Sequence, residues 1–455
     1  MPVNSSGQER QSYGTVFYWH PTVRQHATGQ RPGGPIEIDT MSNKPTTDTE
    51  KNTEQSFDVT IIGGGMVGLT AAIGLAQSGF NVAVVERTPK GDLTAAEYDG
   101  RSSALAFANC RMLEALGIWR HMKQYAQPIN EIRVSDGPSL LHLHFDHKAL
   151  GEGPLGNMVE NRHTRIALFE RLNELKNIQL FLGNDIESLE RTAEKTVVSL
   201  ASGTEITSKL LLGTDGRNSM VRRSANIPVS VFDYKQYGIV CSIEHEIGHE
   251  GIAHERFLPA GPFAILPLTG NRSSLVWTEK AHLVNTIMAL PERSFAAEIQ
   301  RRTGDFLGKI KPVGGRWAYP LSLQYADAYT DTRMAILGDA AHGIHPIAGQ
   351  GLNLGLRDVA ALIEVITDSA RVGLDIGSEQ VLDGYAGWRH ADNAALISVT
   401  DLLNRLFSND VAPIRAARDI GLAVVNEIPP LKNFFMSHAR GTVGELPKLL
   451  RGEAL

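Results

Sequence analysis

A glycine-rich turn between a β-branched run and an apolar helix constrains this chain more than any other feature. Residues 57–88, FDVTIIGGGMVGLTAAIGLAQSGFNVAVVERT, predict a strand, a turn, a helix and a second strand. Gly63 suits the tight turn, Gly65 lets the backbone approach a pyrophosphate, and Gly68 lets helix and strand pack closely. Glu86 ends the second strand, where a carboxylate can accept hydrogen bonds from an adenosine ribose. The unit therefore predicts dinucleotide binding.

A second glycine-rich loop, HPIAGQGLNLGLRD at residues 345–358, lies between a short apolar run and a helical pattern. Asp339, in the turn that follows the apolar run, can hydrogen-bond the hydroxyls of a polyol chain. Backbone N–H groups of the loop are expected beside a helix N-terminus; they belong to Gly349, Gln350 and Gly351. The helix dipole there favours negative charge, which a reduced flavin carries around N1 and the C2 carbonyl. The loop therefore favours FAD over a nicotinamide as the bound dinucleotide.

Composition narrows the remaining classes of function. A formal charge of −6 without a Lys/Arg stripe gives no basis for binding nucleic acid. Cys110 and Cys241 match neither a disulfide framework nor a zinc spacing, and the histidines at 142, 144 and 147 show no metal-ligand spacing with a carboxylate in the sequence, so no metal is expected. No apolar run approaches the roughly 18 to 20 residues of a membrane span, so we expect a cytoplasmic protein.

Three motifs, in this order, resemble the p-hydroxybenzoate hydroxylase-like flavoprotein monooxygenases, the aromatic-ring hydroxylases. They are GxGxxG, TDGRNSMVRR at 214–223, and the Gly338–Asp339 pair followed by the glycine loop. The loop pattern is similar to the ubiquinone-biosynthesis hydroxylases in particular. Three further stretches resemble the same branch: YDGRSSALA at 98–106, MVENRHTRIAL at 158–168 and ERFLPAGPFAILPL at 255–268. The resemblance covers nearly all of the chain from Phe57 onward.

This resemblance implies an α/β fold in which a Rossmann-like (GR2-type) FAD-binding domain is interleaved with a mainly β substrate domain. We expect the FAD-binding domain at residues 57–130, 152–230 and 327–380, the substrate-binding sheet at 131–151 and 231–326, and C-terminal helices at 381–455. Residues 1–56 are polar and broken by Gly and Pro, and are expected to form a disordered extension.

The resemblance also implies a set of cofactor-binding residues, which are Gly63, Gly65, Gly68, Glu86, Arg87, Arg101, Asn161, Asp215, Gly338, Asp339, Pro346, Gly349, Gln350, Gly351 and Asn353. Several of them have a second interpretation. Arg101 either steadies the cofactor or is solvated, and Asp215 either lies near the pyrophosphate or caps a helix. Arg222 and Arg223 either pair with an acid or a phosphate or are ordinary helix surface. No catalytic side chain is assigned.

The implied activity is that of an FAD-dependent monooxygenase in ubiquinone biosynthesis. By resemblance, NAD(P)H reduces tightly bound FAD, O2 adds at flavin C4a, and the hydroperoxide hydroxylates the ring of a polyprenyl phenol. Residues 257–277 supply apolar strands for a dry pocket wall. Two alternatives stay open: a monooxygenase of the same fold acting on a soluble aromatic substrate, and a non-catalytic flavin-binding scaffold of a biosynthetic complex.

The C-terminal segment PPLKNFFMSHARGTVGELPKLLRGEAL, at 429–455, mixes apolar and basic residues. It either docks on a membrane surface, at the inner face of the cytoplasmic membrane, or packs against the body of the protein. Packing is favoured, because prolines and glycines interrupt a long amphipathic helix. A ubiquinone-biosynthesis complex and a homo-oligomer are further partners that the sequence leaves open.

Overall fold

The predicted strand–turn–helix–strand unit begins a mixed sheet with a parallel core. In the computed structural model, strand β1 (Glu54–Ile62) pairs in parallel with β2 (Val82–Glu86) and β11 (Glu205–Gly213). The full order is β17-β18-β11-β1-β2-β8, with the hairpin β9–β10 added at β11. The other strands are β8 (Ile178–Leu182), β9 (Ile186–Arg191), β10 (Thr196–Leu200), β17 (Thr330–Asp331) and β18 (Met334–Ile336). This arrangement confirms the predicted α/β class.

The structure describes residues 54–95, 97, 100–137, 142–151, 153–344, 349–390, 392–393 and 425–455, and all of them fall in one unit, Asn52–Leu455. The extension predicted for residues 1–56 lies outside the described residues as far as residue 53. Its predicted end is wrong, because Glu54, Gln55 and Ser56 already form β1 by pairing with β11. These residues are polar, so the hydrophobic pattern could not reveal this part of the strand, which forms through its backbone pairing with β11.

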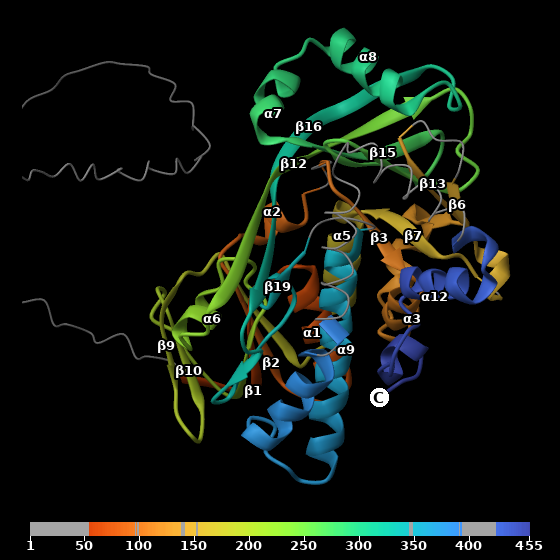
Figure 1. The fold of residues 1–455 in the computed structure, drawn as a ribbon. Coiled ribbons are helices and arrows are strands. Elements are labelled where there is room, and N and C mark those ends of the chain that lie inside the picture. The colour runs from red at the N-terminus through yellow and green to blue at the C-terminus, as the bar shows by residue number, and fades with distance from the viewer. Residues whose placement is uncertain are drawn as a thin grey trace, which may run out of the picture. The chain divides into compact units, whose positions relative to one another are not determined.

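Two long helices, α1 (Met66–Gln77) and α9 (Gln350–Arg371), lie side by side on the parallel sheet (Figure 1). Their close approach depends on small residues: a methyl group added at Gly74 would lie 2.3 Å from Ile363 Cδ1, and one at Gly355 would lie 2.8 Å from Val67 Cγ2. Because Val67 meets Gly355 and Gly74 meets Ile363, the helices run parallel and their N-termini lie at the same end. The largest hydrophobic core lies between these helices and the sheet.

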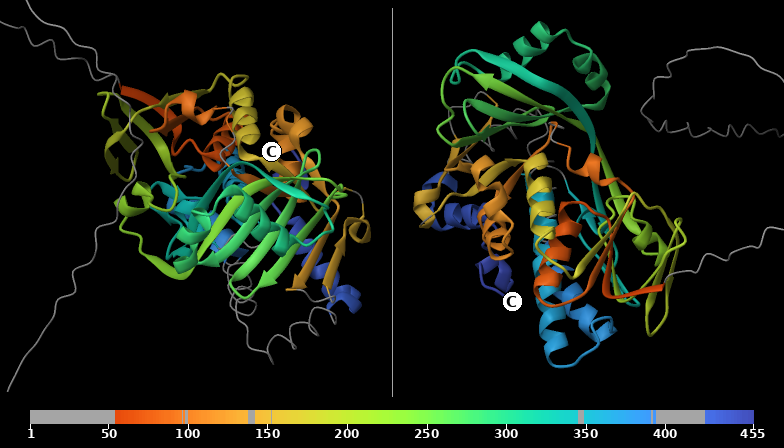
Figure 2. Two further views of the ribbon diagram at one scale, coloured as in Figure 1. Left: turned by 90° about the horizontal axis from the view of Figure 1, so that it is seen from above. Right: turned by 180° about the vertical axis from the view of Figure 1, so that it is seen from behind.

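A second eight-stranded sheet has the order β19-β16-β12-β15-β14-β13-β5-β6. Its strands are β5 (Glu131–Asp136), β6 (His142–Asp146), β12 (Val229–His245), β13 (Ile252–Leu258), β14 (Gly261–Leu268), β15 (Arg272–Lys280), β16 (Ile310–Ala326) and β19 (His342–Gly343). Helices α7 (Ala281–Met288) and α8 (Glu292–Thr303) cover the face of this sheet that points away from α1 and α9 (Figures 1 and 2). We call that face the outer face and the opposite one the inner face.

A three-stranded sheet, β3-β7-β4, lies against the inner face, where β14 contacts both β4 and β7. Its strands are β3 (Ser102–Ala106), β4 (Gln127–Ile129) and β7 (Gly156–Glu160). The remaining helices are α2 (Lys90–Leu93), α3 (Phe107–Ala115), α4 (Trp119–Met122), α5 (Asn161–Leu172), α6 (Met220–Ser224) and α12 (Pro429–Arg440), with short 3-10 turns η1 (Lys123–Tyr125), η2 (His147–Leu150), η3 (Gly338–Ala340) and η5 (Lys448–Arg451). Residues 379–390 are also helical.

The C-terminal segment packs against the body of the protein at several points. Met436, Leu449 and Leu450 are almost fully buried, and η5 contacts α3. Lys448 Nζ lies 2.8 Å from Asp368 Oδ2, which ties η5 to α9. The packing alternative is therefore what the structure shows for these residues, whereas Phe434 on α12 keeps 51% of its surface exposed.

Candidate functional site

The N-termini of α1 and α9 meet where the parallel strands end. Val67, in the first turn of α1, would contact a methyl group added at Gly338 at 3.4 Å and one added at Gly355 at 2.8 Å. Each helix N-terminus carries a partial positive charge and backbone N–H groups without helical partners. Two such ends at one sheet edge favour an elongated ligand with negative charge at two points.

The first glycine turn divides into two packed positions and one open position. Gly63 has a φ of +109°, and a methyl group there would lie 2.5 Å from the Thr214 carbonyl oxygen. A methyl group at Gly68 would lie 2.0 Å from the Gly63 carbonyl oxygen. Gly65 precedes α1, is exposed, and has no atom within 4 Å of an added methyl group. The packing therefore requires Gly63 and Gly68, whereas the space at Gly65 suits a ligand that approaches the backbone.

Glu86 lies beside this turn at the end of β2. Its Oε2 accepts a hydrogen bond from Gly64 N at 2.7 Å, and its Oε1 accepts one from Thr88 N at 2.8 Å. A carboxylate has about four lone-pair positions, so both oxygens can accept further hydrogen bonds from sugar hydroxyls. The next residue, Arg87, is exposed.

The second turn brings a carboxylate and an open helix end to the same edge. Gly338 has a φ of +58°, and the Asp339 side chain that follows is 54% exposed, with Oδ2 3.7 Å from Arg217 Nε. Gly349 caps α9 in the left-handed region at φ +64°, and an added methyl group at Gly351 would meet no atom within 4 Å. Gln350 begins α9 and is partly buried. Pro346 and His345 lie outside the described residues.

Asn353 lies at the start of α9, where the loop pattern predicts it, but its side chain binds protein groups of β3 and α3. It is 2% exposed, and its Oδ1 accepts hydrogen bonds from Ala106 N and Asn109 Nδ2 at 2.9 and 2.7 Å. Its Nδ2 donates to the carbonyl oxygens of Ala104 and Gly349 at 2.8 and 3.1 Å. The amide therefore fixes the start of α9 against β3 and α3, and its polar atoms are already occupied by protein groups.

Asp215 and Arg222 also hold the backbone around the site. Asp215 Oδ2 accepts hydrogen bonds from Met220 N and Val221 N at 2.6 and 3.3 Å, as a cap of α6. Arg222 is 5% exposed and donates to the carbonyl oxygens of Ala340 and Arg217 at 2.7 and 2.8 Å. The helix-surface interpretation is therefore wrong for Arg222, because this side chain crosses the core to the turn after β18. A role of Asp215 toward the pyrophosphate stays a prediction.

Arg101 and Asn161 connect β3 to their surroundings. Arg101 is exposed, but its Nε donates to Tyr319 Oη at 3.1 Å and its guanidinium lies 4.4 Å from the centre of that ring. Asn161 is buried; its Oδ1 accepts from Ser103 Oγ at 2.7 Å, and its N donates to the Arg101 carbonyl oxygen at 3.0 Å. Arg101 is therefore held against β16 of the second sheet.

A buried ionic cluster supports the second turn, and sequence reasoning missed it. Asp358 on α9 is fully buried and accepts hydrogen bonds from Gly338 N at 3.0 Å and Arg389 Nε at 2.9 Å, while its Oδ2 lies 2.6 Å from His342 Nε2. Burial alone would raise the pKa of Asp358, but His342 and Arg389 hold it well below its usual range. Asp358 is the last residue of the loop motif at 345–358, but its side-chain partners lie 16 or more residues away, so no local pattern pointed to them.

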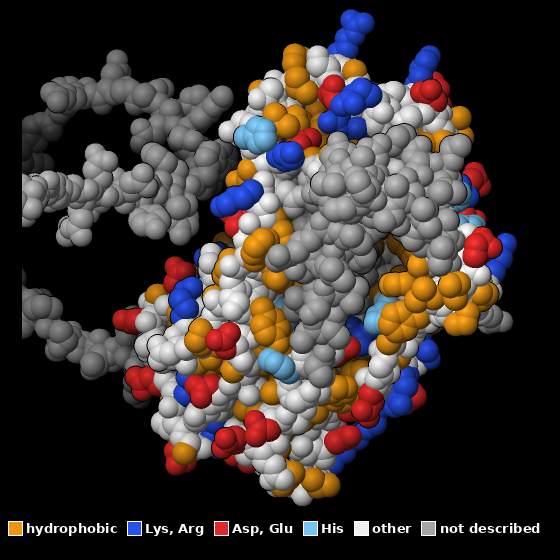
Figure 3. Space-filling model, viewed as in Figure 1, with side chains coloured by type: hydrophobic (Ala, Val, Ile, Leu, Met, Phe, Trp, Pro, Cys, Tyr) orange, Lys and Arg blue, Asp and Glu red, His pale blue; other side chains and the backbone are white. Residues whose placement is uncertain are grey.

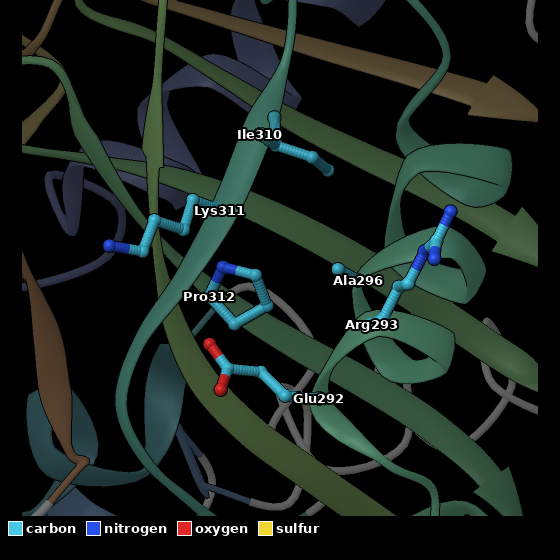
Figure 4. Close-up of a pocket in the computed structure, with 6 residues that line it drawn as sticks. All are labelled: Glu292, Arg293, Ala296, Ile310, Lys311 and Pro312. Atoms are coloured by element: carbon cyan, nitrogen blue, oxygen red, sulfur yellow. The ribbon is translucent and has the colours of Figure 1, made fainter.

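Other features of the structure do not form part of this edge. Helix α8 and the start of β16 border an open pocket on the outer face, lined by Glu292, Arg293, Ala296, Ile310, Lys311 and Pro312 (Figure 4). Cys110 and Cys241 are free and buried in separate cores, and burial raises the pKa of each thiol to about 12. Within the described parts of the chain, no three His, Cys, Asp or Glu residues lie together as a metal site.

Comparisons with known proteins place this geometry in context. Residues 56–400 match the family described as FAD binding domain. The chain is 48% identical to the ubiquinone hydroxylase UbiL of Rhodospirillum rubrum, over 88% of this chain and 93% of that protein. It is 35% identical to the 3-demethoxyubiquinol 3-hydroxylase of Escherichia coli, over 86% of this chain and all of that protein. Its fold is similar to p-nitrophenol 4-monooxygenase PnpA of Pseudomonas putida, with a TM-score of 0.72, 18% identity, and coverage of 86% and 100% of the two chains.

Proposed function

Because the chain belongs to the family of flavoproteins with this FAD binding domain, we propose that it hydroxylates the ring of a polyprenyl phenol in ubiquinone biosynthesis. It is an FAD-dependent monooxygenase. The observation that carries the proposal is the near full-length similarity to ubiquinone hydroxylases, at 48% and 35% identity. The two open glycine positions at adjacent helix N-termini support the cofactor part of the proposal, the binding of FAD.

FAD fits the residues at this edge. The open space at Gly65 and the N-terminus of α1 would hold the pyrophosphate, and Glu86 the adenosine ribose. Asp339 would hold the ribityl hydroxyls, and Gly351 with the N-terminus of α9 would stabilise negative charge on the flavin ring. When bound, FAD supplies the chemistry that inserts one atom of O2 into the ring.

NAD(P)H is the proposed reductant. The balance of the overall reaction is one phenol, one O2, one NAD(P)H and one proton giving one hydroxylated phenol, one NAD(P)+ and one water. The chain's own contribution is to bind, orient and exclude water, because a wet site would release the oxygen as hydrogen peroxide. The inner face of the second sheet, with Ala264, Leu266 and Val276 on it, provides apolar surface for this purpose.

Membrane contact is a further part of this proposal. Ile428, Leu431 and Phe434 are exposed at the start of α12, at 42%, 36% and 51% of their surface. Figure 3 shows hydrophobic side chains gathered on the face of the molecule where α12 lies. A polyprenyl phenol partitions into lipid, so a docking surface of this kind would shorten its path to the site. No helix in the described ranges is long and apolar enough to cross a membrane. A pathway complex and a homo-oligomer stay predictions.

Purified holoprotein tests the proposal directly. It is mixed with NADH or NADPH, O2 and a short-chain probe, 2-geranylphenol, and the products are identified by mass spectrometry. We expect reductant consumption that depends on the probe and a product heavier by one oxygen atom. If only soluble phenols are hydroxylated, the polyprenyl substrate class is wrong. If FAD binds but neither reductant reduces it with any phenol, the scaffold alternative replaces the monooxygenase.

A further inference from the structure

One carboxylate stands in an otherwise apolar row across the inner face of the second sheet. Glu255 on β13 is directly opposite Val134 on β5 and Ala264 on β14, and the row continues through Val276 and Val240. Because directly opposed residues share a face of a sheet, all of these side chains point to the same side. A single Glu in such a row is unusual, since an unpaired charge facing an apolar surface costs free energy.

The neighbours of Glu255 show which side that is. Ala253 and Phe257, two positions away on β13, belong to a core shared with Met158 of β7, whereas Arg256 points to the outer face and donates to the Arg302 carbonyl oxygen at 2.9 Å. Ala104 of β3 packs on the same inner core. Glu255 therefore faces the cofactor-binding part of the chain, not α8.

The inner core also leads to the second glycine turn. A methyl group added at Gly349 would lie 3.1 Å from Ala104 Cβ, so the loop that begins α9 touches a residue of this core. At the other end of the row, Trp317 lies opposite Val240 and packs on Gly100, next to Arg101. The row that contains Glu255 thus lies on the face of the sheet on which β3 packs, and Ala104 of β3 connects that face to the start of α9.

The surroundings of Glu255 perturb its carboxyl group. No hydrogen bond or ion pair joins it to another described residue, and burial raises the pKa of its carboxyl to about 7. The charged groups nearby are committed elsewhere or buried: Arg133 and His254 lie on the outer face, Glu160 of β7 pairs with Arg272 at 2.8 Å, and Asp136, on the inner face of β5, is buried. A carboxyl group whose pKa is displaced from its ordinary value toward neutrality, and which has no partner among the described residues, is typical of functional sites.

We propose that Glu255 is the general base that accepts the proton of the substrate's phenolic hydroxyl. The inference rests on the proposed function. The O–H bond of the phenol breaks, its electron pair stays on the ring oxygen, and the proton moves to a Glu255 carboxylate oxygen; it returns to the product's oxygen after hydroxylation. The phenolate ring is richer in electrons and therefore a better acceptor of the incoming oxygen atom.

Glu255→Gln in the FAD-loaded protein tests this role, with Glu292→Gln on the outer face as the matched control. Turnover of 2-geranylphenol by the unchanged protein should rise with pH through about 7, as the Glu255 carboxyl ionises. E255Q should lower kcat by about 100-fold and abolish this rise, with KM and FAD content changed little, whereas E292Q should match the unchanged protein. A ring-fluorinated 2-geranylphenol, whose hydroxyl is more acidic, should restore E255Q turnover selectively.

The outcomes separate the two proposals. If the unchanged protein hydroxylates no phenol, the proposed function fails. If it does so and E255Q keeps its rate and pH profile, only the role of Glu255 fails. If E255Q does not fold, the unchanged protein with the fluorinated phenol decides: the rise through about pH 7 should weaken, and an identical rise with both phenols would overturn the role.

Discussion

Alanine substitutions at Gly65 and Gly68 should separate cofactor binding from folding. A methyl group at Gly65 meets no atom within 4 Å, and its φ of −74° and ψ of 178° suit alanine. Gly65→Ala should therefore change the free energy of unfolding of the FAD-free protein by no more than about 1 kcal/mol. At Gly68 the methyl group would lie 2.0 Å from the Gly63 carbonyl oxygen and 2.5 Å from Thr214 Oγ1. Gly68→Ala should destabilise the FAD-free protein by about 1–3 kcal/mol.

FAD affinity should fall in G65A even though its stability hardly changes. The same methyl group at Gly65 would occupy the space through which the pyrophosphate approaches the backbone, at an overpacking cost of about 1–3 kcal/mol. That cost corresponds to a loss of roughly 5- to 150-fold in FAD affinity. Flavin-fluorescence titration of the FAD-free protein measures the affinity, and urea unfolding of the same sample measures its stability. The reasoning is refuted if G65A binds FAD as the unchanged protein does, or if it unfolds as readily as G68A.

Three further predictions use the same assays or simple extensions of them. Asp358→Asn should cost about 3–5 kcal/mol of stability at neutral pH, because it leaves buried charges unpaired. Because the pKa of Asp358 is lowered on folding, the unchanged protein should lose this contribution only below about pH 3.9. Unfolding measured at several pH values tests both statements. Asn353→Ala should cost about 1–3 kcal/mol for each buried group left unpaired and weaken FAD binding through the displaced start of α9, measurable by urea unfolding and flavin titration. The double change Leu431→Ser and Phe434→Ser should reduce flotation with liposomes by about tenfold or more. The control Phe306→Ser, at an exposed residue on a different part of the surface, should leave flotation unchanged. Equal flotation of the unchanged protein, the double variant and F306S would rule out the α12 surface.

The first glycine unit was predictable because its requirements are local. Gly63, Gly65, Gly68 and Glu86 lie within one strand–turn–helix–strand unit, where spacing alone fixes their relation. The strand ahead of Asp339 and the helix after Gly349 were predictable for the same reason. The polar start of β1 was not, because pairing with β11 depends on residues about 150 positions away.

The roles of individual polar side chains were harder to predict than their positions. Asn353 falls in the predicted loop, but its amide binds β3 and α3, which are more than 240 residues earlier in the chain. The sequence left open whether Arg222 pairs with an acid or phosphate or lies on the helix surface, whereas in the structure it is buried and donates to the Ala340 carbonyl oxygen. Glu255 had no signal in the sequence, because it lies between His254 and Arg256 in β13, and only the sheet register shows that it faces an apolar row.

The most direct test of the central claim is mass spectrometry of quinone-pathway lipids from cells that lack this gene, with a strain complemented by the unchanged gene beside them. We predict that ubiquinone falls, that a prenylated precursor one hydroxylation short accumulates, and that complementation reverses both changes. The identity of the precursor would also give the ring position. An unchanged lipid profile in cells with no second ring hydroxylase would contradict the assignment to ubiquinone biosynthesis.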